Sequence, residues 1–296
     1  MNVLSLFDGL SCGQIALTNL GCFPDKYYAS EVDKFAIQQT HHVFPDTIHI
    51  GDVTKVDVSK LDKIDLIIGG SPCQSFSFAG KQAGMATTEN IEVTGLDQYL
   101  DLKIMGFEFT GQSYLFWEYM RILTEVRKYN PSVKFLLENV VMSKRWEAVL
   151  TNAIGVEPVM INSNLLSAQN RKRLYWTNIA QITQPEDEGI FIRDILEGDV
   201  DGIIVASRGR LDADGVTRQH IEPRTDGKSN CLTTVQKDNL LQTRAGLRQL
   251  TPTECARLQT VPSWYEWAVS DTQIYRMCGN GWTVRVIEHI LKNLFV

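Results

Sequence analysis

Short apolar runs alternate with stretches of helical periodicity over roughly the first 180 residues. This alternation predicts an α/β fold in which a parallel sheet is covered by helices. The predicted strands are Val3–Leu6, Tyr27–Ser30, Ile48–Ile50, Ile64–Ile68, Val133–Leu137, Val156–Ile161 and Arg173–Thr177. The predicted helices are Cys12–Leu20, Lys34–Val43, Tyr114–Lys128 and Lys144–Asn152.

The pattern breaks in segment 80–112, which is polar and only partly periodic. Loops of this length in compact domains are commonly lids, binding loops or disordered segments. The composition changes again in segment 185–247, which is rich in Gly, Asp, Arg and Thr. Its only strand-like pieces are short, such as Gly202–Ala206 and Cys231–Val235, and they predict a small separate domain that is mainly β and irregular.

Helical signals return near the end of the chain. Thr251 can cap a helix whose first position is Pro252 and whose last is Leu258. A final amphipathic helix is predicted for Thr283–Leu294. These signals place a third part of the chain at residues 248–296.

The net charge of −6 does not indicate a nucleic-acid binder, but its distribution is uneven. Residues 201–250 hold eight Lys or Arg against six Asp or Glu, whereas residues 1–200 hold 17 against 25. A surface that faces phosphates requires such a local concentration. A solvated surface of mixed charge explains the counts equally well.

No apolar run approaches the ~20 residues that a membrane span needs, and the acidic N-terminal turn lacks the positive charge of a signal peptide. The cysteines form no CxxC pair and no Cys/His cluster at zinc spacing. They are Cys12, Cys22, Cys73, Cys231, Cys255 and Cys278. We therefore expect reduced thiols, no metal site and a cytoplasmic protein.

The turn FDGLSCG, residues 7–13, follows a strand and opens a helix. Its glycines let a ligand approach the backbone, and the helix N-terminus offers free N–H donors. Glu31 after the second strand is placed to bind ribose hydroxyls, and Asp52 after the third to bind an adenine amino group. Because the turn is not GxGxxG and Asp8 would repel a pyrophosphate, a phosphate-free adenosine cofactor is favoured over NAD.

Three further segments carry reactive groups, each with a structural alternative. Cys73 lies in GGSPCQSFS directly after a strand, where a thiol is placed as a nucleophile, although a lone Cys usually fills a core. Glu138 follows the strand Val133–Leu137, where partial desolvation suits a general acid, although a helix-capping carboxylate is as consistent. Arg171 and Arg173 share one face of a strand and suit a phosphate or developing anion, although a solvated charge run is the common alternative.

The chain resembles the DNA (cytosine-5) methyltransferase family over nearly its whole length. The matching segments are, in order, FDGLSCG, Glu31, Asp52, GSPCQSFS, ENV, QNRKR, RQLTPTECARLQTVP and GNGWT. The resemblance implies a Rossmann-like S-adenosylmethionine-dependent methyltransferase sheet with helices on both faces in residues 1–184, and a small target-recognition domain in residues 185–247. It also implies that residues 248–296 return to the catalytic domain. The size is that of a small bacterial or phage enzyme.

The resemblance also implies a mechanism on a cytosine that is flipped out of duplex DNA. Cys73 would add to C6 of the base, while Glu138 would hydrogen-bond or protonate N3 and Asn139 would help to hold that edge. Arg173 would neutralise the O2 side, and Arg171 would position the phosphate or the loop that carries the cysteine.

Two groups of binding residues are implied by the same resemblance. S-adenosylmethionine is expected to contact Phe7, Asp8, Gly9, Leu10, Ser11, Gly13, Glu31, Val32, Asp52, Val53, Pro72, Asn280 and Trp282. DNA is expected to contact Gln74, Ser77, Lys81, Gln82, Arg208, Arg210, Thr233, Thr234 and Lys237.

The chain departs from the family pattern in segment 86–110, which resembles an insertion in the loop that closes over the flipped base. We expect this insertion to add DNA contacts or a partner surface. A tRNA cytosine-5 methyltransferase and a non-catalytic DNA-binding relative are the alternative functions. We expect a monomer acting on double-stranded DNA, and the sequence leaves open the target site and whether a cognate restriction endonuclease accompanies the protein.

Overall fold

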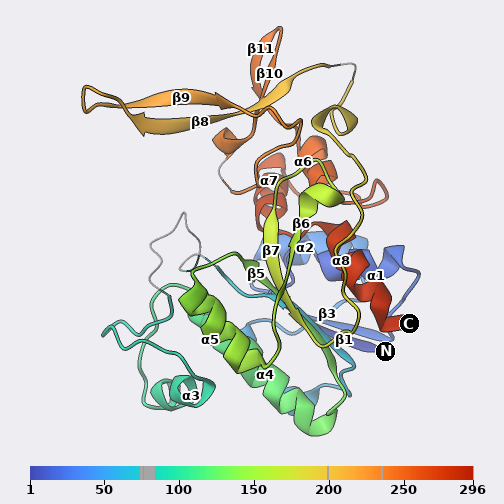
Figure 1. Ribbon diagram of the computed structural model, residues 1–296. Helices are drawn as coiled ribbons and strands as arrows, with labels where there is room; N and C mark the ends of the chain where they lie inside the picture. Colours follow the sequence, from blue (N-terminus) through green and yellow to red (C-terminus); the bar gives the residue numbers. More distant parts are fainter. Residues whose placement is uncertain (74–75, 77–83, 199, 235, 296) are drawn as a thin grey trace.

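A computed structural model describes residues 1–73, 76, 84–198, 200–234 and 236–295, and its centre is a seven-stranded sheet. The strands are β1 (Asn2–Leu6), β2 (Lys26–Ser30), β3 (Ile48–His49), β4 (Leu66–Gly70), β5 (Lys134–Val140), β6 (Val159–Asn162) and β7 (Lys172–Thr177). They lie in the order β3-β2-β1-β4-β5-β7-β6 (Figure 1).

Helices cover both faces of this sheet (Figure 1). They are α1 (Cys12–Asn19), α2 (Lys34–Val43), α4 (Phe116–Tyr129), α5 (Lys144–Ile154) and α8 (Val284–Leu291). Val3 and Leu4 are neighbours in β1, and both are fully buried in different hydrophobic clusters because successive strand residues point to opposite faces. The cluster around Val3 includes residues of α1, α2 and α8, whereas the cluster around Leu4 includes residues of α4 and α5. The predicted α/β fold class is confirmed.

The prediction of a parallel sheet is wrong at one edge. Strands β1 to β5 pair in parallel, but β7 is antiparallel to both β5 and β6. Only residues 163–171 separate β6 from β7, which is shorter than the crossover that a parallel pair needs. A pattern of apolar positions does not encode strand direction.

Two strands extend further toward their carboxyl ends than predicted. Strand β4 runs to Gly70, and β5 runs to Val140, so Glu138 lies within β5. Glu138 is in register with Gly70 on one side and with Tyr175 of β7 on the other. Both neighbouring strands thus continue the ladder past the apolar run, and the helix-cap interpretation of Glu138 is wrong.

The polar segment 86–110 is folded rather than irregular. Its ends are joined by an antiparallel bridge between Thr87 and Phe109. Between them lies α3 (Leu96–Ile104), which the sequence analysis missed because polar residues surround its few apolar ones. Tyr99 of this helix is almost fully buried in the cluster that contains residues of α4, so segment 86–110 is attached to the layer of helices on the central sheet by packing.

A second, antiparallel sheet has the order β11-β10-β8-β9. Its strands are β8 (Ile203–Leu211), β9 (Thr217–Pro223), β10 (Leu240–Thr243) and β11 (Gly246–Gln249). Strands β8 and β9 form a long ribbon that projects from the body of the protein (Figure 1). The sheet ends at Gln249, beyond the predicted domain boundary at Leu247. Ile204 and Leu241 are buried in the same cluster as α1 and α8, which ties this sheet to the rest of the chain.

The predicted strand Cys231–Val235 is wrong, because residues 231–234 form no strand. The backbone groups of Leu232 bind side chains instead of another strand. Its N–H donates to Oε1 of Gln169 at 2.7 Å, and its carbonyl accepts from Nη1 of Arg171 at 2.9 Å.

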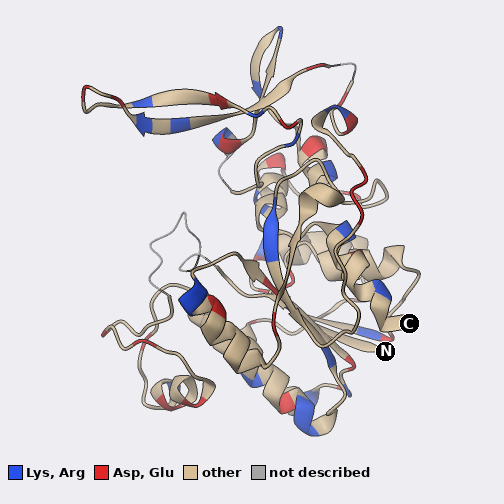
Figure 2. Ribbon diagram, viewed as in Figure 1, with Lys and Arg blue, Asp and Glu red and all other residues tan. Residues whose placement is uncertain are grey.

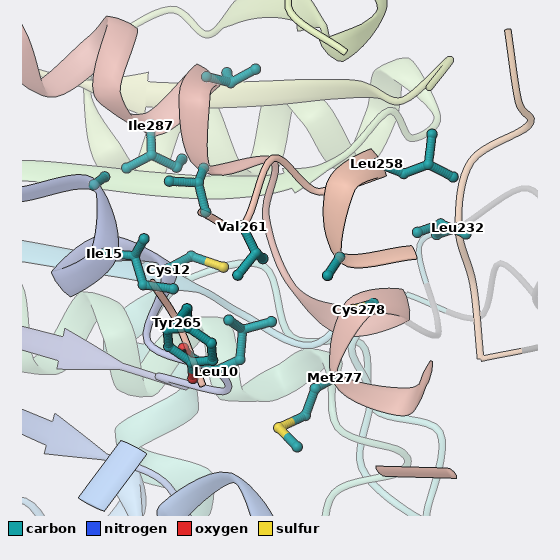
Figure 3. Packing of buried hydrophobic residues seen from close by; sticks show 14 of the residues in the cluster. Leu10, Cys12, Ile15, Leu232, Leu258, Val261, Tyr265, Met277, Cys278 and Ile287 are labelled. Carbon is teal, nitrogen blue, oxygen red and sulfur yellow. The ribbon is translucent and has the colours of Figure 1, made fainter. Parts of the chain in front are cut away.

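The C-terminal part forms α6 (Pro252–Leu258), α7 (Asp271–Asn280) and α8. The predicted cap is confirmed, because Thr251 Oγ1 accepts from the Glu254 N–H while the Glu254 carboxylate accepts from the Thr251 N–H. Residues of this part pack against the first turn, and Tyr265 Oη donates to the Leu10 carbonyl at 3.0 Å (Figure 3). None of the helices in the described part of the chain is long and apolar enough to cross a membrane.

The contact between the insertion and α4 depends on one buried carboxylate. Glu118 has a fully buried side chain and accepts from Tyr99 Oη, Lys103 Nζ and Arg121 Nε at 2.5–2.7 Å. Glu118→Ala removes the anion and leaves its donors without it, so we expect a loss of about 3–5 kcal/mol in the free energy of unfolding. Urea unfolding monitored by circular dichroism measures this loss.

Glu125→Ala is the matched control, because Glu125 contacts the same Arg121 from a position that is one-third exposed. We expect that variant to lose less than about 1 kcal/mol. Equal losses in the two variants would contradict the anchoring role of Glu118.

Candidate active site

A cavity of about 410 Å³ lies at the carboxyl ends of the central strands, where open α/β sheets bind ligands. Most of the residues predicted to act on the cofactor or the base line this cavity. These are Phe7, Asp8, Gly9, Leu10, Glu31, Val32, Asp52, Val53, Pro72, Cys73, Glu138, Arg171, Arg173, Asn280 and Trp282.

Ser11 and Gly13 do not line the cavity, and their predicted contact with the cofactor stays a prediction. Ser11 is fully buried in a left-handed conformation at the start of α1. A Cβ at Gly13 would lie 2.0 Å from Ile68 Cδ1 and 3.2 Å from Tyr27 Oη. The absence of a side chain at Gly13 therefore lets α1 pack closely on the sheet.

Glu31 holds two turns of the cavity wall together. One carboxylate oxygen accepts from the Gly9 N–H at 2.8 Å, and the other accepts from the N–H groups of Val32 and Asp33 at 2.7 and 2.8 Å. Since a carboxylate offers about four acceptor positions, one stays available for a hydroxyl donor. The predicted ribose contact is compatible with this arrangement.

Asp8 is a buried carboxylic acid in the cavity wall. Its Oδ1 accepts from Tyr27 Oη at 2.9 Å, while its Oδ2 has no hydrogen-bond partner among the described residues. Burial raises the pKa of Asp8 to about 6, and the nearby Glu31 contributes to the same direction. An unpartnered anionic oxygen in a cavity wall suits a cationic ligand.

Cys73 lies on a turn directly after β4. Asn139 Nδ2 donates to the Ser71 carbonyl and hydroxyl at 3.2 and 3.0 Å, and the Phe76 N–H donates to the Cys73 carbonyl at 2.9 Å. Asn139 is 1% exposed and does not line the cavity, and its amide positions the turn. Its predicted contact with the edge of the cytosine stays a prediction.

The half-buried Cys73 thiol is held between opposing charges. Burial raises its pKa, and the negative charge of Glu138 raises it further, whereas Arg173 and Arg171 lower it. The net effect is a pKa above the ordinary value for a thiol. In this state the group is a thiol at neutral pH, and removal of the charge on Glu138 would favour the thiolate.

Glu138 is held by two donors. Arg173 Nε lies 2.8 Å from its Oε1, and Trp282 Nε1 donates to its Oε2 at 3.1 Å. The Glu138 side chain is 10% exposed and the Arg173 side chain 14%. Trp282 comes from the C-terminal segment, which thus contributes one of the two donors to Glu138.

Arg171 is 3% exposed and joins three parts of the chain. Its Nη1 donates to the Leu232 carbonyl at 2.9 Å and to Cys231 Sγ at 3.1 Å, and its Nη2 donates to the Gly281 carbonyl at 2.7 Å. Its Nε has no partner among the residues that the structure describes. Arg171 thus connects these three parts of the chain at the wall of the cavity. Its Nε–H remains available as a donor there.

Several lining residues were missed from the sequence. Gln112 and Leu115 precede α4 and follow the insertion, where no local motif marks them. Arg276 pairs with Asp33 at 3.0 Å across the rim of the cavity. Only the proximity of α7 to the end of β2 brings these two together, and neither segment shows it alone.

The predicted DNA-contacting residues fall into three groups. Gln74, Ser77, Lys81 and Gln82 lie outside the described residues. Figure 2 shows basic positions on the β8–β9 ribbon, where Arg208 and Arg210 both pair with Glu222. Thr233, Thr234 and Lys237 are exposed on the segment that follows Cys231.

Comparisons with known proteins add the family. A model described as C-5 cytosine-specific DNA methylase matches residues 1–97 and 199–296. The chain is 30% identical over 306 residues to the type II methyltransferase M1.ScrFI of Lactococcus lactis subsp. cremoris, which covers 90% of this chain and 71% of that protein. It is 28% identical over 329 residues to the type II methyltransferase M.NlaX of Neisseria lactamica, with coverages of 99% and 95%.

Among solved structures, the fold is similar to that of the S. pombe Dnmt2 methyltransferase. The TM-score is 0.69, with 19% sequence identity and 100% coverage of both chains. At this identity the likeness concerns the fold alone.

The buried Asp8 predicts a pH-dependent stability. A folded-state pKa of about 6 above the ordinary 3.8 means that the folded protein binds the extra proton, so this contribution is full below about pH 4 and is lost as the pH rises through 6. Asp8→Asn keeps an acceptor for Tyr27 but cannot ionise. We expect the variant to have a higher Tm than the wild type at pH 7.5, with the difference shrinking toward pH 4.5. Melting curves that stay parallel across this range would contradict the burial of an ionised Asp8.

Proposed function

This chain belongs to the C-5 cytosine-specific DNA methylase family, and on that premise we propose that it methylates a flipped-out cytosine through a covalent bond between Cys73 and C6. As a member of that family it is a DNA (cytosine-5-)-methyltransferase that uses S-adenosylmethionine. The observation that carries the proposal is the shared cavity, which Cys73, Glu138 and Arg173 line together with the cofactor candidates.

The end of the cavity formed by the turns after β1, β2 and β3 fits a cationic adenosine cofactor. Asp8, Glu31, Asp33 and Asp52 all line it, and the unpartnered oxygen of Asp8 lacks a cationic or donor group. Four carboxylates disfavour a phosphate-bearing nucleotide. S-adenosylmethionine has no phosphate and carries a sulfonium and an ammonium group, so the donor set matches it.

Individual contacts in this pocket follow from the chemistry of the side chains. Glu31 is assigned to the ribose hydroxyls and Asp52 to the adenine amino group, with Val32 and Val53 against the apolar ring. Phe7 and Trp282 offer aromatic faces to a cation. When bound, S-adenosylmethionine supplies an electrophilic methyl group.

Cys73 reacts as a thiolate, because the thiol is a poor nucleophile. When the Glu138 carboxyl shares a proton with N3 of cytosine, its negative charge no longer opposes ionisation of Cys73, while Arg173 and Arg171 still favour it. Binding of the correct base therefore activates the nucleophile. The proton that leaves the Cys73 thiol passes to N3 through Glu138 while Sγ adds to C6, which breaks the C5–C6 double bond and makes C5 electron-rich. After C5 is methylated, water takes up the C5 proton, the double bond re-forms and the Cys73–C6 bond breaks, and the N3 proton returns to the thiolate.

The target base has to leave the duplex, at a cost of roughly a few kcal/mol. Arg208, Arg210 and Lys237 are assigned to DNA, together with Thr233 and Thr234 next to the site. The insertion 86–110 holds five carboxylates and one lysine, a balance that disfavours phosphate contacts and leaves a partner surface as its assigned role. A cognate restriction endonuclease and the monomeric state stay predictions.

The first test uses radiolabelled S-adenosylmethionine with unmethylated plasmid DNA and, in parallel, bulk tRNA, followed by base-resolution mapping of 5-methylcytosine. We expect label in DNA at one short recurring sequence and none with Cys73→Ser. Label confined to tRNA would overturn the DNA substrate, and full activity of Cys73→Ser would overturn the mechanism. Absence of label in both, from protein that binds the cofactor, would point to a non-catalytic relative.

Glu138→Gln separates the two effects of this carboxylate. Methyl transfer should fall by about 10²–10⁴-fold, because the variant cannot give a proton to N3. At the same time the pKa of Cys73 should fall, because the substitution removes the negative charge of Glu138 that raises this pKa. The measurement is the pH dependence of Cys73 alkylation by iodoacetamide, followed by peptide mass spectrometry. An unchanged or raised alkylation midpoint would contradict the coupling between Glu138 and Cys73.

A further inference from the structure

Two arginines of the site converge on one sulfur that the mechanism above does not use. Cys231 Sγ lies 3.1 Å from Nη1 of Arg171 and 3.5 Å from Nη2 of Arg173. Burial acts to raise the pKa of Cys231, but the two guanidinium groups outweigh it and the pKa is lowered. The sulfur therefore accepts hydrogen bonds from two guanidinium groups, which are charged donors.

Arg173 is therefore held from two sides. Its Nε pairs with Glu138, and its Nη2 donates to Cys231. Glu138 in turn accepts from Trp282. Partners from β5 and from the segment between β9 and β10 thus determine the orientation of the Arg173 guanidinium. The position of the Glu138 carboxylate depends on that orientation.

Cys231 belongs to the segment between β9 and β10, outside the central sheet. This segment is attached through Leu232, whose N–H and carbonyl bind Gln169 and Arg171. The next residues, Thr233 and Thr234, are exposed and are assigned to DNA. A change in this segment when DNA binds would reach Arg173 directly through the sulfur.

We propose that Cys231 is a positioning residue for methyl transfer. Its sulfur holds the Arg173 guanidinium against Glu138 and links the segment between β9 and β10 to the site. The inference rests on the proposed function, and Cys231 itself forms no bond to the substrate. The sulfur of Cys231 and the carboxylate of Glu138 contact the Arg173 guanidinium from two sides. Because Arg173, Arg171 and Glu138 all act on the pKa of Cys73, a displacement of the Arg173 guanidinium changes that pKa.

The test compares Cys231→Ala and Cys231→Ser with the wild type in methyl transfer to the mapped DNA sequence. Serine keeps a neutral acceptor for the two arginines, whereas alanine removes it. We expect kcat of the alanine variant to fall about tenfold with little change in KM for DNA, and serine to recover most of kcat. Cys22→Ala is the matched control, because Cys22 is half-buried and contacts neither arginine, and it should behave as the wild type.

A second readout needs neither DNA nor cofactor. In the Cys231→Ala variant the alkylation midpoint of Cys73 should move, because the Arg173 guanidinium is no longer held in place and its charge acts on the pKa of Cys73; in Cys231→Ser the midpoint should move less. Wild-type kcat in the alanine variant would overturn the proposal. So would an equal loss in both variants with a raised KM for DNA, a lowered Tm and an unmoved alkylation midpoint, which is the signature of a structural role. If the wild type itself transfers no methyl group to DNA, the proposed function fails, and an unmoved midpoint would then also overturn the role of Cys231.

Discussion

The rest of the site depends on the hydrogen bonds that the buried guanidinium of Arg171 donates. It donates to the carbonyls of Leu232 and Gly281 and to the sulfur of Cys231. One cation therefore joins the segment between β9 and β10 and the C-terminal segment to the start of β7. Breaking a buried charged contact costs about 3–5 kcal/mol when its partners stay unpaired. The walls of the cavity come from parts of the chain that are more than a hundred residues apart.

The cavity is divided electrostatically into two ends. Carboxylates dominate where the turns after β1 to β3 meet, and arginines balanced by Glu138 dominate around Cys73. The end lined by carboxylates favours a cationic ligand over a phosphate. The end around Cys73, where Glu138 balances the arginines, changes its net charge when it gains or loses one proton. In the proposed function, the cofactor and the Cys73 thiol would occupy these two different ends of one cavity. The burial of Asp8 without a second hydrogen bond is a local loss of stability that such a division requires.

The apolar periodicity predicted the central strands and helices well, because the strands are buried on both faces and the helices on one. The periodicity failed to predict the structure where the hydrogen-bond partners of a segment are distant in sequence. The antiparallel direction of β7, the extension of β5 through Glu138 and the absence of a strand at Cys231 all depend on neighbours that the local pattern does not contain. Helix α3 was missed because its apolar residues are few, and they are buried against α4.

Motifs predicted the residues of the site better than their roles. Cys73, Glu138 and Arg173 do line one cavity, but Asn139 holds the Ser71 turn, and Gly13 packs against Ile68. Cys231 and Arg276 carry no motif, and only the packing of the recognition and C-terminal segments places them at the site.

The most direct measurement of the central claim is the mass of the complex formed with a duplex that carries 5-fluorocytosine at the mapped target position. Fluorine at C5 cannot be lost as a proton is, so the bond between Cys73 and C6 should persist after methylation. The account predicts a covalent protein–DNA species in the presence of S-adenosylmethionine, with the crosslink on the peptide that contains Cys73 and none in Cys73→Ser. A methylated product without any covalent species, or a crosslink on another residue, would contradict it.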